Sequence, residues 1–161
     1  MVLGIDIGGT NTEFAVVDST KGIVHVEKIK TKAHNSFINY IENFTDKIKG
    51  LTKKFNISSI GIGAPNFDSG SNTFCPVNFS WKDVSPFNLQ QHLEHEVSVP
   101  ISVVNDANAV ALAENRYGIG RKVNSFIIIT IGTGLGAGIV INNRLFDGSY
   151  GYAGEFGHTK L

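Results

Sequence analysis

The sequence has one cysteine among its 161 residues and no net charge. The single cysteine, Cys75, excludes an internal disulfide and a metal site built from several cysteines. Lysine and arginine together number 14, as do aspartate and glutamate, so the chain has no overall charge to attract nucleic acid or an anionic membrane. These absences favour a small-molecule partner.

The sequence also has no long hydrophobic run. No apolar stretch approaches the roughly 20 residues of a membrane-spanning helix. A strand pattern begins at Val2 and leaves no room for a signal peptide. We therefore expect a cytoplasmic protein that contacts neither nucleic acid nor membrane.

Glycine is abundant, with 18 residues, and it separates strand patterns near both ends of the chain. Alternating apolar residues predict a strand at residues 2–7, a glycine turn from Gly8 and a second strand at residues 14–17. These two strands form a hairpin. A third strand is predicted at residues 23–29.

The middle of the chain alternates helix and strand patterns. Six apolar residues recur at steps of three and four and predict one face of a helix: Phe37, Ile41, Phe44, Ile48, Leu51 and Phe55. The other predicted elements are a strand at 58–63, a helix at 87–97, a strand at 101–104 and a helix at 107–117. Residues 67–86 have no period and predict a long loop anchored by Trp81, and loops of this length are often functional.

A second unit follows the glycines at residues 118–120, which break the last helix. Its predicted parts are a strand at 126–131, a glycine turn at 132–138, a return strand at 139–141, a hairpin turn at Asn142-Asn143 and a strand at 145–146. This order repeats that of the first unit and indicates a duplicated architecture. We therefore divide the chain into an N-terminal domain, residues 1–117, and the beginning of a second, truncated domain, residues 118–161.

Both glycine turns have the residues that a phosphate-binding loop needs. Gly8-Gly9-Thr10 and Gly132-Thr133-Gly134 present backbone N–H groups without an obstructing Cβ, and each includes a threonine hydroxyl that can donate to phosphate. A dinucleotide-binding fingerprint fits poorly, because a strand is predicted after Gly138 where that fingerprint requires a helix. A tight hairpin explains either turn alone, and the presence of two matching turns favours phosphate binding.

Three polar segments are candidate site residues. Asp6 lies at the mouth of the first turn, where a carboxylate can hold Mg²⁺ or cap the turn. Asp106 lies where a buried strand is followed by a helix, a position that suits a ligand site but by itself fits a helix cap better. The segment from Gly154 to His158 includes an acid and a base, which fits a sugar site or an ordinary surface loop.

Five segments together, in this order along the chain, resemble the ROK (repressor, open reading frame, kinase) family. They are Ile5-Asp6-Ile7-Gly8-Gly9-Thr10, Gly61-Ile62-Gly63-Ala64-Pro65, Asn105-Asp106-Ala107-Asn108-Ala109, Ile131-Gly132-Thr133-Gly134-Leu135-Gly136-Ala137-Gly138 and Gly154-Glu155-Phe156-Gly157-His158. The match extends from end to end. The chain resembles the N-terminal portion of a glucokinase-like sugar kinase.

The resemblance implies an α/β chain with the actin-like ATPase (ribonuclease H-like) fold, with the N-terminal domain complete or nearly so and the second domain begun. It implies an ATP-dependent sugar kinase that transfers the γ-phosphate to a hydroxyl of a hexose, with glucose the expected sugar. The alternatives are an N-acetylated amino sugar kinase, a sugar-binding transcriptional regulator of the same family and a sugar-binding module without turnover. The regulator is disfavoured, because such members have a DNA-binding segment ahead of the first phosphate loop.

The resemblance also assigns roles to residues. Asp106 resembles the catalytic base. The residues that resemble the sugar-binding set are Gly63, Ala64, Pro65, Asn105, Glu155 and His158. The residues that resemble the ATP-binding set are Asp6, Gly8, Gly9, Thr10, Asn11, Gly132, Thr133 and Gly134, and Asp6 would hold Mg²⁺ through the nucleotide.

Two features depart from the family pattern. Asn11 stands where many members have lysine, so less positive charge lies near the phosphates. Many members bind structural zinc through the histidine that matches His158 and through cysteines beyond it, so Zn²⁺ is expected only with a C-terminal part that follows Leu161. We expect a homodimer at full length, and the sequence leaves open whether this fragment is active by itself.

Overall fold

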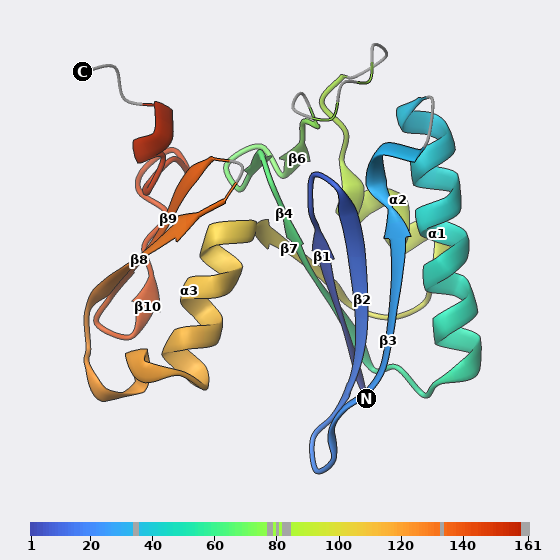
Figure 1. Cartoon of the computed structure of the whole chain (residues 1–161), viewed down its shortest axis with the longest axis horizontal. Coiled ribbons are helices and arrows are strands. Elements are labelled where there is room, and N and C mark those ends of the chain that lie inside the picture. The colour runs from blue at the N-terminus through green and yellow to red at the C-terminus, as the bar shows by residue number, and fades with distance from the viewer. Residues whose placement is uncertain (34–35, 77–78, 80, 82–84, 133, 159–161) are drawn as a thin grey trace.

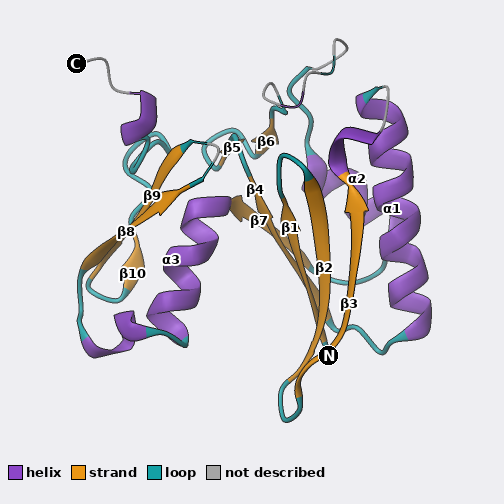
Figure 2. Ribbon diagram, viewed as in Figure 1, coloured by secondary structure: helices purple, strands orange, loops and turns teal. Residues whose placement is uncertain are grey.

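A computed structural model describes residues 1–33, 36–76, 79, 81, 85–132 and 134–158. Two sheets and three α-helices form its framework (Figure 1). Helix α3 lies between the sheets, and α1 and α2 lie beyond the other side of the first sheet (Figure 2). The expected α/β class is confirmed.

The first sheet has five strands in the order β3-β2-β1-β4-β7. Their bounds are β1 Val2–Ile7, β2 Asn11–Asp18, β3 Gly22–Lys30, β4 Ser59–Ala64 and β7 Ile101–Asn105. The first three pair antiparallel, while β4 pairs parallel to both β1 and β7. The predicted strands are confirmed to within one residue at their ends, except that β2 begins three residues before the predicted position.

Helix α1, Phe37–Lys54, packs its predicted apolar stripe into the main core. The Ser36 hydroxyl accepts the Asn39 N–H at 3.2 Å and caps the first turn. Phe55, the last residue of the predicted stripe, is the C-cap and is only partly buried. Helix α2, Leu89–Glu96, adds Leu89 and Leu93 to the same core.

The predicted loop at residues 67–86 contains a small hairpin, β5 Phe67–Asp68 with β6 Thr73–Phe74. Trp81 is buried and stacks on Phe79 with a centroid distance of 5.2 Å, so its predicted anchoring role is confirmed. The rings of Phe37 and Tyr40 on α1 also lie against Trp81, at 5.6 and 5.0 Å. Aromatic packing therefore attaches this excursion to the first unit.

The second sheet has the order β10-β9-β8 and contacts α3, Asp106–Arg116. Its strands are β8 Phe126–Ile131, β9 Leu135–Ile141 and β10 Arg144–Leu145. The predicted turn at Asn142-Asn143 is confirmed, since both residues have positive φ. Single-turn 3₁₀ helices occur at Thr31–Ala33, Ile119–Lys122 and Phe156–His158.

The second glycine turn is shorter than predicted, because β9 already begins at Leu135. Gly136 and Gly138 are strand residues that face α3. A Cβ on Gly138 would lie 2.5 Å from the Ala111 Cβ, and one on Gly136 would lie 3.2 Å from the Ala107 Cβ. These two glycines are explained by close packing of a helix on a strand rather than by a ligand.

The outer face of β8 is apolar. Ile127, Ile129 and Ile131 alternate along it with exposed fractions of 53%, 60% and 87%. Among the described residues, no helix is both long enough and apolar enough to cross a membrane.

The division of the chain into two domains at residue 118 stays a prediction. It places α3 in the first domain, and α3 contacts both sheets.

Candidate active site

The carboxyl ends of three neighbouring strands meet at one edge of the first sheet. Asp6 on β1 is in register with Gly63 on β4, and Ala64 on β4 is in register with Asn105 on β7. Pro65 and Asp106 follow directly along the chain. The two predicted aspartates and the predicted Gly63-Ala64-Pro65 segment are thus brought to the edge where α/β sheets bind ligands.

The N-terminus of α3 is capped by Asn105. Its Oδ1 accepts the N–H groups of Ala107 at 2.9 Å and Asn108 at 3.3 Å. Asp106 is therefore the first helical residue rather than the cap, and its Oδ1 also accepts the Ala107 N–H, at 2.8 Å. The cap occupies the amide oxygen of Asn105, so the predicted sugar contact of this residue is left to its Nδ2 donor.

The charge of Asp106 acts on Asp6. The pKa of Asp6 is raised above its ordinary value of 3.8, first by partial desolvation and then by repulsion from Asp106 and Glu13. Asp6 is nevertheless an exposed residue, open to solvent at this edge of the sheet. The mutual repulsion of nearby carboxylates is relieved when a cation binds between them.

The first glycine turn closes through its own backbone. The Gly8 N–H donates to the Asn11 carbonyl at 3.0 Å, and a Cβ on Gly8 would lie 2.7 Å from that oxygen. Gly9 has neither a positive φ nor any atom within 4 Å of a Cβ placed on it. Thr10 and Asn11 are exposed beside it. The protein itself therefore does not require glycine at position 9, whereas a closely approaching phosphate would.

The second glycine turn joins β8 to β9. The Gly132 N–H donates to the Gly134 carbonyl at 3.0 Å. Gly132 and Gly134 also have open space where a Cβ would stand, while the predicted Thr133 lies outside the described residues. In Figure 1 the turn between β1 and β2 lies at the upper end of the first sheet, and α3 begins beside the end of β7.

The segment near the chain end runs beside β9. A Cβ on Gly154 would lie 2.2 Å from the Ala137 carbonyl oxygen, and one on Gly157 would lie 2.3 Å from that of Leu135. Glu155, between these glycines, is exposed. Because Gly136 of the same strand packs on Ala107, β9 connects Glu155 to the N-terminus of α3. The side chain of His158 lies outside the described part of the chain.

Two further hydrogen bonds hold the stretch of chain between β10 and Gly154, and the sequence analysis gave no role to the residues that form them. The Asn108 Nδ2 donates to Asp147 at 3.0 Å, while its buried Oδ1 has no partner within the described ranges. Tyr152 donates its hydroxyl to Asp68 at 3.3 Å. The first contact joins α3 to the segment after β10, and the second joins the excursion to the same segment. Only Asn108 lay within a motif that the sequence singled out.

The acidic groups at this edge of the sheet offer carboxylate oxygens, the donor type that Mg²⁺ prefers in proteins. The pKa of Asp6 is raised first by desolvation and then by repulsion from Asp106 and Glu13. Zinc needs a compact set of nitrogen and sulfur ligands. No group of three or more His, Cys, Asp or Glu side chains that could hold a metal occurs in the described residues.

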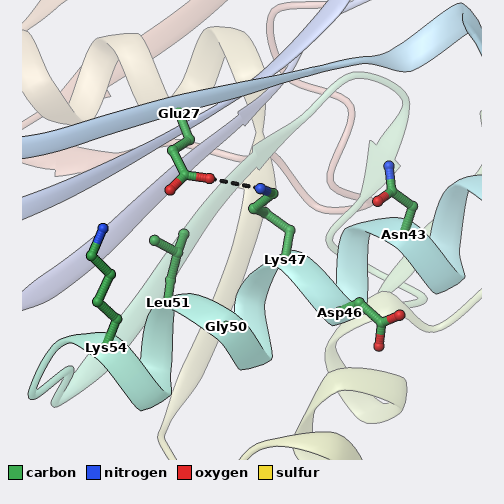
Figure 3. Close-up of a pocket in the computed structure, with 7 residues that line it drawn as sticks. All are labelled: Glu27, Asn43, Asp46, Lys47, Gly50, Leu51 and Lys54. Atoms are coloured by element: carbon green, nitrogen blue, oxygen red, sulfur yellow. Dashed lines mark hydrogen bonds and ion pairs between the residues drawn. The ribbon is translucent and has the colours of Figure 1, made fainter.

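A separate hollow lies between β3 and α1, away from the site. Figure 3 shows the Glu27–Lys47 ion pair, at 2.7 Å, spanning it. The hollow has a volume of about 380 Å³. Its lining consists of Glu27, Asn43, Asp46, Lys47, Gly50, Leu51 and Lys54, and none of the predicted site residues is among them.

Comparison with known proteins gives a family match along the chain. The model of the ROK family matches residues 2–161. A glucokinase of Streptomyces coelicolor is 34% identical over all of this chain and 50% of its own length. A glucokinase of Halalkalibacterium halodurans is 36% identical over 99% of this chain and 49% of its length, and a xylose repressor of Caldicellulosiruptor bescii is 32% identical over 99% and 41%. The chain spans about half the length of the curated relatives it matches.

Solved structures agree with this match. A ROK family glucokinase from Streptomyces griseus in complex with glucose and AMPPNP superposes with a TM-score of 0.82 and 36% identity, over 99% of this chain and 50% of that one. A ROK hexokinase from Thermus thermophilus gives 0.80 and 29%, over 99% and 53%. The expected actin-like ATPase fold is thereby confirmed.

Proposed function

The chain belongs to the ROK family, and on that premise we propose that it forms part of an enzyme that phosphorylates a hexose with ATP. Glucose is the expected sugar. The observation that carries the proposal is the convergence of Asp6, Gly63 and Asp106 at one sheet edge. The glucokinase bound to glucose and AMPPNP supports both substrates by analogy.

In the proposed reaction Asp106 is the general base. Its carboxylate accepts the proton of a sugar hydroxyl as that oxygen attacks the γ-phosphorus of ATP. The bond from the γ-phosphorus to the bridging oxygen breaks, and ADP leaves with the electron pair. A base of this kind contributes about 10²–10⁴-fold, and positioning together with charge neutralisation supplies the rest. Capping by Asn105 supports this role, because the helix does not depend on Asp106 alone for its cap.

The two glycine turns and Asp6 would hold the nucleotide. Open space at Gly9, Gly132 and Gly134 allows phosphate oxygens to approach the backbone N–H groups. Asp6 would hold Mg²⁺, which when bound neutralises charge on the transferred phosphate. The proposed sugar contacts are the following residues: Gly63, Ala64, Pro65, Asn105, Glu155 and His158.

Several finer proposals follow from membership of the family. We propose that residues 1–117 form one domain and residues 118–161 part of a second, that the whole protein is a cytoplasmic homodimer, and that zinc binds only if His158 is joined by further ligands. Kinases of N-acetylated amino sugars and sugar-responsive repressors stay as alternatives. The xylose repressor matches nearly all of this chain, so the match by itself does not separate the two classes.

A coupled ADP-release assay with a panel of hexoses and N-acetylhexosamines tests the proposal. It is run on this chain and on a form with the length of its relatives. We expect hexose-dependent ADP release from the longer form, with Asp106→Asn losing about 10²–10⁴-fold in kcat while sugar affinity is kept. The matched control is Asp46→Asn, an exposed aspartate on α1. Near-normal kcat in Asp106→Asn would remove the base, and DNA binding without ADP release would favour the repressor.

A further inference from the structure

A chain of buried hydroxyl groups runs from helix α1 to the first glycine turn. The Tyr40 hydroxyl lies 2.8 Å from the Thr12 Oγ1, which lies 2.9 Å from the Thr31 Oγ1. Thr31 in turn donates to the carbonyl oxygen of Gly8 at 2.8 Å. Tyr40, Thr12 and Thr31 are each 0% exposed. Burying three hydroxyls is unfavourable unless every one is hydrogen-bonded, so the chain depends on all of its links.

The direction of each hydrogen bond in this chain is determined. A carbonyl oxygen only accepts, so the single proton of the Thr31 hydroxyl points to Gly8. Thr31 must therefore accept from Thr12, whose own proton is used in that bond. Thr12 must then accept from the hydroxyl of Tyr40. Desolvation raises the pKa of Tyr40, so this hydroxyl stays protonated and remains a donor.

The last link determines which way one peptide group faces. In a trans peptide the C=O and the following N–H point in opposite directions, and the chain has no cis peptide bond among its described residues. The Gly8 carbonyl points inward to Thr31, so the Gly9 N–H points outward to the exposed side of the turn. Thr31 also donates its backbone N–H to the Thr10 carbonyl at 2.9 Å, so it holds the turn on both sides of Gly9.

We propose that Thr31, held through Thr12 by Tyr40, is a positioning residue that aims the Gly9 N–H at a phosphate of the bound nucleotide. The inference rests on the proposed function, because it takes the first turn as a phosphate site. A Cβ placed on Gly9 would meet none of the described atoms within 4 Å, so the space beside this residue is open to a ligand. A peptide oriented before binding avoids the entropic cost of ordering it when the phosphate arrives.

The plain alternative is that the three hydroxyls only satisfy one another inside the core. Thr31→Val removes the hydroxyl at nearly constant volume, and Thr31→Ser restores it. The matched control is Thr45→Val, which removes another buried threonine hydroxyl, bonded to the His92 Nε2 at 3.1 Å and unconnected to the turn. Both valine variants lose a buried hydrogen bond, so a purely structural role predicts similar losses of stability and no selective effect at Gly9.

Two measurements on this chain test the proposal, with urea unfolding to correct for stability. The first is the amide shift and hydrogen exchange of Gly9 in the free protein, by ¹⁵N NMR. The second is titration with Mg-ATP and with inorganic triphosphate. In Thr31→Val we expect an altered Gly9 amide and a dissociation constant raised roughly tenfold, the effect of one weakened hydrogen bond to a charged group. Thr31→Ser and Thr45→Val should bind as the wild type does.

The outcomes separate the two proposals. An unchanged Gly9 amide in folded Thr31→Val overturns the positioning role, whatever the nucleotide does. An altered amide with unchanged Mg-ATP affinity shows that the hydroxyl chain orients the turn for structure only, and this also overturns it. If neither this chain nor a form with the length of its relatives binds Mg-ATP or triphosphate, the phosphate site itself is wrong, and the proposed function fails along with the inference.

Discussion

Asp6 and Asp106, far apart in the sequence, lie close enough in the fold for the charge of Asp106 to help raise the pKa of Asp6. The strands β1, β4 and β7 bring them together by parallel pairing in register. A carboxylate pair of this kind carries excess negative charge until a cation reaches it. The arrangement is consistent with a site for Mg-nucleotide.

The first prediction concerns this pair. Asp106→Asn removes one of the two charges that repel Asp6, so the pKa of Asp6 should fall toward its ordinary 3.8. The measurement is a carboxyl ¹³C NMR titration of Asp6 in buffer containing a chelator. Asp46→Asn, on the exposed face of α1, should leave the titration unchanged. An Asp6 pKa that does not move in Asp106→Asn would show that Asp106 does not contribute to the shift.

The same pair has a consequence for stability. An aspartate with a raised pKa in the folded state binds protons more tightly there than in the unfolded chain. Stability is therefore lost as the pH rises from 3.8 through the raised value. Asp106→Asn should reduce this loss, and urea unfolding at a series of pH values measures it.

The second prediction concerns the glycines of β9. Gly138→Ala places a Cβ 2.5 Å from the Ala111 Cβ and 2.7 Å from the Ala107 carbonyl oxygen, so α3 must move away from the strand. We expect a loss of about 1–3 kcal/mol in the free energy of unfolding, measured with urea. The control is Gly61→Ala in β4, where no atom lies within 4 Å. Equal effects of the two changes would argue against close packing as the reason for Gly138.

The third prediction concerns Tyr40, whose pKa is raised above 10.0 by burial. Tyr117, Tyr150 and Tyr152 are all more than half exposed. In an alkaline absorbance titration Tyr40 should ionise only as the protein unfolds, because burial keeps its hydroxyl protonated in the folded state. Stability is lost as the pH rises above 10, because the unfolded state then releases a proton that the folded state keeps.

Tyr40→Phe is the matched variant for this titration. It should remove the absorbance change that Tyr40 contributes on unfolding. A reversible change in the folded wild type that is missing from folded Tyr40→Phe would contradict the burial of Tyr40.

The fourth prediction concerns Glu27, which joins β3 to α1. Its pKa is lowered to about 2 by hydrogen bonds from Lys47 and then His25. This stabilisation is complete above pH 4.5 and is lost as the pH falls toward 2. Glu27→Gln should cost only about 0.5–1 kcal/mol at neutral pH, because solvent screens partly exposed ion pairs.

Urea unfolding of wild type and Glu27→Gln between pH 2 and neutrality measures this contribution, and the two curves should converge at low pH. Glu42→Gln, which changes an exposed carboxylate on α1, is the control and should have little effect. A difference between wild type and Glu27→Gln that persists at low pH would point to packing rather than charge.

Local sequence patterns predicted most of the elements because their causes are local. The stripe from Phe37 to Leu51 is a helix because its period matches one helical face, and Asn142-Asn143 is a turn because asparagine tolerates positive φ. The resemblance carried by five short motifs identified the family. The ends of β2 and β9 were placed less well, since pairing with neighbouring strands extends a strand beyond its own apolar pattern.

The sequence by itself therefore determined the order of the elements, the family and the set of candidate residues. Only the tertiary structure decided which glycines face open space and which pack against a helix. Gly9 and Gly138 are the same residue type, yet of the two only Gly138 lies against α3. The tertiary structure also decided that Asn105 caps α3 and that the charge of Asp106 reaches Asp6. The hydrogen bonds that link Tyr40 through two threonines to the Gly8 carbonyl likewise appear only in the folded chain. These properties depend on distances between residues far apart in the chain, which sheet register and helix packing set and which no local pattern encodes.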